Sequence, residues 1–111
     1  MSAASDALGD RLRPLLPKGL IEKKMFGGLG FMLNGNMAIG TTAKGALLVR
    51  VDPDKADEAL ARKGAFQMHM GPRPMKGFIA VDETGTASAA ALKEWIAASL
   101  AYARTLPPKG D

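Results

Sequence analysis

The sequence predicts a two-layer α+β domain in which helices cover one face of a single, mainly antiparallel sheet of five strands. Periodicity and turn signals divide the chain into a helix, three strands, a helix, two strands and a helix. The connections between consecutive strands are short, which favours antiparallel pairing. The chain has 111 residues, 47% apolar and 23% charged, the size and balance of one folded domain. We therefore expect one domain over residues 1–111, ordered from about residue 5 to about residue 105.

The first helix is expected over residues 5–16, where leucines recur on one helical face. Ser5 can cap it, but Pro14 removes a backbone donor, so the helix kinks or ends near Arg13. The following apolar segment predicts one long bent strand over 22–33, with a glycine bulge at Gly27 and Gly28.

Turn signals then separate the next two strands. The Asn-Gly-Asn sequence at 34–36 marks a tight turn before a strand over 37–41, and a second turn precedes a strand over 46–51.

The second half of the sequence begins with a helix. Asp52 is a suitable N-cap and Pro53 suits the first helical position, which predicts a helix over 53–63. Strands follow over 65–70 and 75–81, joined by a rigid loop. Ser88 caps a long helix to about Arg104, and residues 107–111 are expected to fray.

Composition excludes several classes of site. The chain has no cysteine, which excludes disulfides, thiolate metal sites and a cysteine nucleophile. Its single histidine, His69, excludes a multi-histidine metal site, and no segment approaches the length of an apolar membrane span. A cytoplasmic protein without cofactor or metal is the expectation.

A family resemblance is carried by segments 24–31 (KMFGGLGF), 34–37 (NGNM), 47–52 (LLVRVD) and 64–66 (GAF), with Met75 and the Trp95 helix behind them. With these segments the chain resembles the N-terminal domain of the TfoX/Sxy family, which is associated with regulation of bacterial natural competence. The resemblance extends from about residue 8 to 104 and implies the order α–β3–α–β2–α, similar to secretion-chaperone-like folds. It implies no catalytic residues, and we expect a stand-alone module because the second domain of full-length competence regulators does not follow.

The glycine-rich segment is the first candidate site. A glycine loop can cradle phosphate when it opens a helix, but here strand-like residues follow. The alternatives are a structural bulge, or a groove for a partner where side chains are missing. The candidate residues are Met25, Phe26, Gly27, Gly28 and Gly30.

Metal and catalytic sites find less support. On a strand, Met68 and Met70 point away from His69, so this trio is not expected to converge, and methionine commonly fills gaps in cores. No carboxylate pair is placed for acid–base chemistry, so we expect no catalytic residues and no enzyme.

Five cations on or beside strands form the second candidate site. They make an anion-binding patch if the sheet brings them together, and otherwise they lie around its edges with their stems on apolar surface. The aromatic residues, Phe66 among them, are expected mostly in the core, which excludes a stacking platform for single strands. The cations are Lys23, Lys24, Arg50, Arg73 and Lys76.

The strands carry apolar residues on both sides, as Leu47 and Val49 against Leu48 illustrate. A solvated second face would alternate apolar and polar residues. Part of this face is therefore expected to be buried, either by a second copy or partner protein, or by the C-terminal helix and tail.

These observations favour a non-enzymatic regulatory module that acts through protein–protein contacts, with a homodimer as one form. The alternative is a nucleic-acid-associated transcriptional regulator that uses the basic residues, since residues 1–50 carry all of the net charge of +4.

Overall fold

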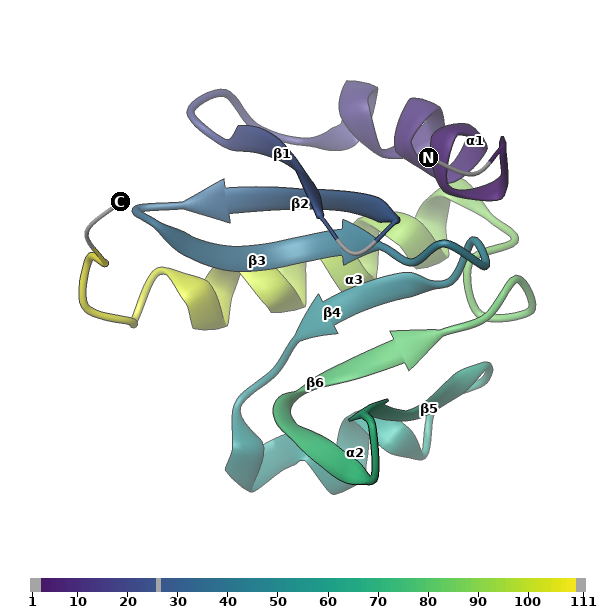
Figure 1. Ribbon diagram of the computed structural model, residues 1–111, viewed down its shortest axis with the longest axis vertical. Coiled ribbons are helices and arrows are strands. Elements are labelled where there is room, and N and C mark those ends of the chain that lie inside the picture. Colours follow the sequence, from purple (N-terminus) through teal and green to yellow (C-terminus); the bar gives the residue numbers. More distant parts are fainter. Residues whose placement is uncertain (1–2, 26, 110–111) are drawn as a thin grey trace.

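The sheet has six antiparallel strands in the order β1-β2-β3-β4-β6-β5, and three α-helices pack against it (Figure 1). The computed structural model describes residues 3–25 and 27–109. The antiparallel α+β architecture is confirmed, whereas the prediction of five strands is wrong. The strands are β1 Ile21–Met25, β2 Gly28–Leu33, β3 Asn36–Thr41, β4 Leu47–Arg50, β5 Ala65–Met70 and β6 Arg73–Val81.

The extra strand arises at the glycine pair. Gly27 has a φ of 77°, a left-handed conformation that glycine adopts without steric cost. The chain reverses there, so that Met25 pairs with Gly28 and two antiparallel strands replace the single bent strand. The predicted bulge at Gly27 and Gly28 is therefore wrong, and the irregularity in this region lies between Phe31 and Met32 instead.

The first helix, α1, covers Ala3–Leu12 and gives way to a 3₁₀ turn, η1, over Arg13–Leu15. The predicted end near Arg13 is confirmed, and Pro14 supplies the reason because it cannot continue the helical hydrogen bonds. Ser5 does not cap this helix. It lies within α1, fully buried, and its hydroxyl shares a 2.6 Å hydrogen bond with Thr41 of β3.

The last helix begins where its cap predicts, whereas the helix predicted from residue 53 begins with a 3₁₀ turn, so that the α-helix itself begins at Ala56. Asp52 accepts a hydrogen bond from the Asp54 backbone before the 3₁₀ turn η2, Pro53–Lys55, and helix α2, Ala56–Leu60. This helix is shorter than predicted because the Arg62 amide bonds to Ala59, three residues back, which tightens and ends the last turn. Ser88 caps α3, Ala89–Ala103, through the Ala91 amide. None of the helices in the described part of the chain is long and apolar enough to cross a membrane.

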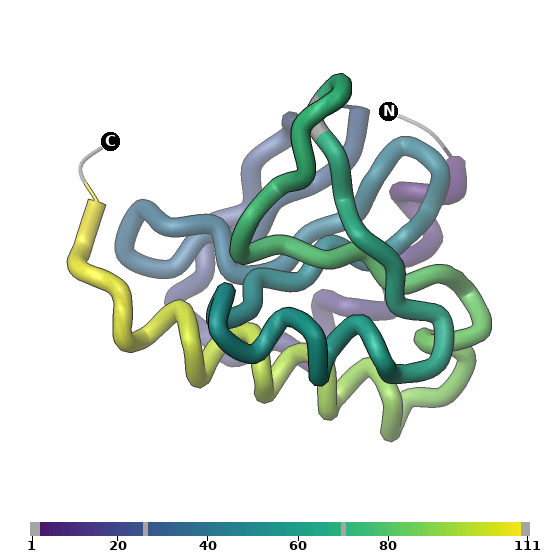
Figure 2. Tube along the Cα trace, turned by 90° about the horizontal axis from the view of Figure 1, so that it is seen from below, coloured from purple at the N-terminus to yellow at the C-terminus, as the bar shows by residue number. Residues whose placement is uncertain are grey.

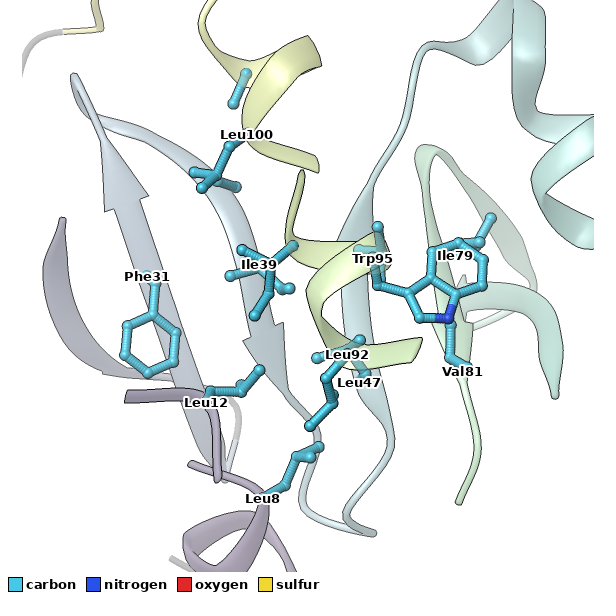
Figure 3. Close-up of a cluster of buried hydrophobic side chains, with 14 of the residues drawn as sticks. Leu8, Leu12, Phe31, Ile39, Leu47, Ile79, Val81, Leu92, Trp95 and Leu100 are labelled. Carbon is cyan, nitrogen blue, oxygen red and sulfur yellow. The ribbon is translucent and has the colours of Figure 1, made fainter. Parts of the chain in front are cut away.

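One buried cluster joins the helices to one face of the sheet (Figure 3). Trp95 of α3 lies beside Ile79 of β6, and Leu8 and Leu12 of α1 lie near Leu92. The apolar side chains of α2 pack against the same cluster. The strand residues of the cluster are Leu29, Phe31, Ala38, Ile39, Leu47, Val49, Ile79 and Val81.

The described part of the tail after α3 contacts the turn between β2 and β3, whereas the last two residues of the predicted frayed tail lie outside the described residues. Asn36 donates to the Pro107 carbonyl at 2.9 Å, and the Lys109 amide donates to the Asn34 carbonyl at 2.7 Å. The described tail therefore runs past the end of the sheet and does not cross its second face.

Thr41→Val is expected to lower the free energy of unfolding by about 1–3 kcal/mol, the typical cost of leaving buried donors unpaired. The Thr41 hydroxyl is buried and also accepts from the Leu29 amide at 3.0 Å. Urea denaturation measures the change. Thr105→Val is the matched control, because this exposed hydroxyl bonds the nearby Tyr102 carbonyl and no other group of the described residues, and a change of less than about 0.5 kcal/mol is expected there.

Candidate interaction groove

The two faces of the sheet differ in what covers them. Strand alternation separates the buried cluster from a second row of residues that points away from the helices. Figure 2 shows α2 and α3 on one side, and the β5–β6 hairpin rising on the other. We call this second side the open face. Its central row runs across the sheet through Lys23, Gly30, Gly40, Leu48, Ala80 and Phe66.

A cavity of about 280 Å³ lies on the open face, between the end of β1 and the β5–β6 hairpin. We call it the methionine groove. Four methionine side chains line it. These methionines and Phe78 are half-buried, whereas Leu48 is buried. The side chains that matter below are Met25, Met37, Met68, Met75, Leu48, Phe78 and His69.

Two paired glycines lie beneath methionines that line the methionine groove, and we call this pair its floor. A Cβ atom on Gly30 would stand 2.9 Å from the Met25 sulfur and 3.4 Å from the Met37 sulfur. On Gly40 it would stand 2.4 Å from the Leu29 carbonyl oxygen and 3.1 Å from the Met37 methyl carbon. The absence of side chains at these two positions lets both methionines lie flat on the sheet.

His69 does not point away from its neighbour as predicted, because both Met68 and His69 line the groove. The pairing of β5 with β6 shifts between Gln67 and His69, and this irregularity breaks the alternation on which the prediction depended.

Arg50 holds a positive charge beside the groove. Its guanidinium stacks over the Phe78 ring at 4.9 Å and donates to the Met37 carbonyl at 3.3 Å. Its buried Nε has no hydrogen-bond acceptor among the described residues. The ring contact and the hydrogen bond hold the Arg50 side chain in place. A buried donor without an acceptor is uncommon in folded proteins, and the guanidinium has further N–H groups that can donate hydrogen bonds.

The two lysines of β1 lie on opposite faces. Lys23 pairs with Gly30 in the open-face row. Lys24 shares the other face with Glu22, whose carboxylate accepts from Arg13 of η1 at 2.8 Å. That hydrogen bond, with the charge of Arg13, lowers the pKa of Glu22. Of the two alternatives for the five cations, one common patch therefore does not include Lys24, which lies away from Lys23.

The remaining cations, Arg73 and Lys76, are exposed on the β5–β6 hairpin, which forms one wall of the groove. Phe66, predicted for the core, is 44% exposed at the far end of the open-face row. Its position on the edge strand β5 explains the difference, since no strand lies beyond it.

The glycine-rich segment does not form a phosphate loop, because β2 and not a helix follows the turn. Met25 lines the groove and Gly30 lies beneath it, whereas Gly27 and Gly28 serve the turn and the close strand pairing. Phe26, also a predicted site residue, lies outside the described residues. The sequence analysis did not include Met37, Leu48 and Phe78 among the site residues, although all three line the groove. Their apolar side chains on the second side of the strands were the feature of the sequence that could have indicated them.

The described residues contain no group of three histidine, aspartate or glutamate side chains placed to hold a metal ion. Arg50, Lys23 and an apolar cavity are the chemistry that the open face offers. Such an arrangement suits an apolar group that carries negative charge nearby.

Comparison with known families identifies one match: the sequence pattern of the TfoX N-terminal domain matches residues 10–103. The match spans the whole sheet and all of α3. Comparisons with curated proteins and with solved structures give no match.

Gly30→Ala and Gly40→Ala are expected to differ in stability although both residues lie on the same floor. At Gly40 the new methyl group meets backbone, which predicts a loss of about 1–3 kcal/mol from overpacking. At Gly30 it meets the flexible end of Met25, so a loss below about 1 kcal/mol is expected, with a shift of the Met25 methyl NMR signal. Equal losses of unfolding free energy would contradict this account of the floor.

Proposed function

The chain belongs to the TfoX N-terminal domain family, and from this premise we propose that it is a non-catalytic regulatory module that binds a protein partner through the methionine groove. The TfoX N-terminal domain is a domain of competence regulators, which supports a regulatory role. The setting implied by that family is the bacterial cytoplasm.

The observation that carries this proposal is the uncovered apolar cavity on the open face. The helices pack against the opposite face, and the described tail is bound at the β2–β3 turn. No described segment of the chain therefore fills the cavity. Exposed apolar surface of this kind is characteristic of interaction sites, and methionine side chains adapt to the shape of what they contact.

Site-specific photo-crosslinking in living bacteria tests where the partner binds. A photoreactive amino acid at position 75 reports on the groove, and one at Ala97 reports on the exposed side of α3. The proposal expects a protein adduct at position 75 that is absent at position 97. An adduct with the mass of two chains would identify a homodimer, and equal labelling at both positions would reject the groove as the site.

Met37→Lys is expected to abolish the adduct at position 75, because it places a charge in an apolar cavity where no described carboxylate can pair with it. Ala97→Lys is the matched control, since it adds the same charge to an exposed helical surface and should leave the adduct unchanged. Circular dichroism confirms that both variants fold. An undiminished adduct with Met37→Lys would contradict the proposal.

Five of the six charged side chains in the strands are cations, and this observation supports a second candidate function, association with nucleic acid. Binding through phosphate contacts falls steeply as salt rises, with a slope set by the number of phosphates neutralised. Titration with duplex and single-stranded DNA from about 50 to 200 mM salt checks it. Absent or salt-independent binding would remove this candidate.

A further inference from the structure

We propose that the occupant of the methionine groove is an acidic protein segment, with an aliphatic side chain in the cavity and a carboxylate on Arg50. This inference rests on the proposed function and adds the chemistry of the partner.

The cavity accepts side chains more readily than a whole ligand. Its volume of about 280 Å³ lies just below the range of roughly 300–1,000 Å³ typical of small-molecule pockets. Thioethers, the Phe78 ring and Leu48 make up most of its lining, and the polar side chains in that lining belong to Thr41, Thr42 and His69. Aliphatic side chains bury their surface in such a cavity without leaving polar groups unpaired, so the buried part of the partner is aliphatic.

Arg50 determines the charge of the partner next to this cavity. Its guanidinium contacts two lining residues, Phe78 through the ring and Met37 through the carbonyl. No described carboxylate forms an ion pair with it. A half-buried guanidinium fixed in one orientation gains most from a carboxylate, which accepts two of its hydrogen bonds at once.

The charges of the strands extend this complementarity beyond Arg50. The sole strand carboxylate, Glu22, faces the helices and is paired with Arg13, so it does not offset the open face. Lys23 lies at one end of the central row, and Arg73 and Lys76 lie on the opposite hairpin. A second copy docked face to face would oppose like charges, whereas an acidic segment would meet cations on both sides of the cavity.

The same features favour a peptide over a nucleic acid. Stacking of successive bases needs several free aromatic faces. The guanidinium of Arg50 already covers one face of Phe78, which leaves Phe66, at the far end of the open-face row, as the exposed ring that the structure describes on this face. The thioethers of the cavity offer neither charge nor strong hydrogen bonds to sugar and phosphate.

Selection from a randomised peptide library, with the full chain as bait, tests the proposal. We expect enriched peptides that carry aspartate or glutamate close to leucine, isoleucine or valine. The dissociation constants of these peptides are then measured by fluorescence polarisation for the wild type and three variants. Duplex DNA of random sequence serves as a competing probe.

Arg50→Gln should weaken these peptides about tenfold or more, which corresponds to the loss of one charge-assisted hydrogen bond. Arg62→Gln is the matched control: this arginine also stacks on an aromatic ring, Trp95 at 3.8 Å, but on the helical side of the domain. It removes the same charge, and a change of less than about twofold in the dissociation constant is expected if only the open face is involved.

The outcomes separate the two levels of the proposal. Enriched peptides without acidic residues, or unchanged binding with Arg50→Gln, overturn the acidic partner; if Met37→Lys still abolishes their binding, the groove remains the interaction site. If Met37→Lys leaves the dissociation constants of the peptides unchanged, or if the selection enriches no peptide, the groove is not the interaction site. DNA that displaces the peptides and loses affinity with Arg50→Gln would assign the surface to nucleic acid and overturn the proposal.

Discussion

The packing of Trp95 and its neighbours in α3 against the central strands fixes which side of the sheet is buried. Because side chains alternate along a strand, burial of Leu47, Val49, Ile79 and Val81 under the helices turns Leu48, Arg50, Phe78 and Ala80 to the other side. The open face therefore follows from the core, and a shift of one residue in register would remove both together.

That constraint also explains the composition of the open face. A sheet covered on one side usually presents polar residues to water on the other. Here the central row holds glycines and an alanine, with methionines lying over the glycines. The glycines leave space above the sheet, and flexible methionine side chains line the resulting groove. The surface can therefore adapt its shape to what it contacts. At Gly40 the Leu29 carbonyl leaves no room for a side chain, whereas at Gly30 the space above the strand is taken by the flexible end of Met25.

Much of this fold could be predicted from the sequence, because local signals fix it. Ser88 caps α3 as expected, Asp52 caps the 3₁₀ turn that precedes α2, and the first α-helix ends near Arg13, just before Pro14. The strand count was wrong because a glycine pair is compatible with a bulge or a turn, and only pairing across the sheet decides between them. The face of His69 was wrong for a related reason, since a register shift leaves no mark in the sequence.

The site could be predicted less well than the fold. Apolar residues on both sides of the strands predicted that part of the second face is buried by another segment or by a partner. Arg50 and Met25, which lie beside and in the groove, were among the candidate residues. The groove itself depends on Gly30 pairing with Gly40, and on Met37 crossing over both. Those contacts join residues on separate strands, and their distances depend on twist and bulges that no local pattern specifies. The open face is therefore defined by the shape of the groove and by a positive charge that no described carboxylate neutralises. Glu22 is paired with Arg13 on the helical face, and no described carboxylate pairs with Arg50 on the open side.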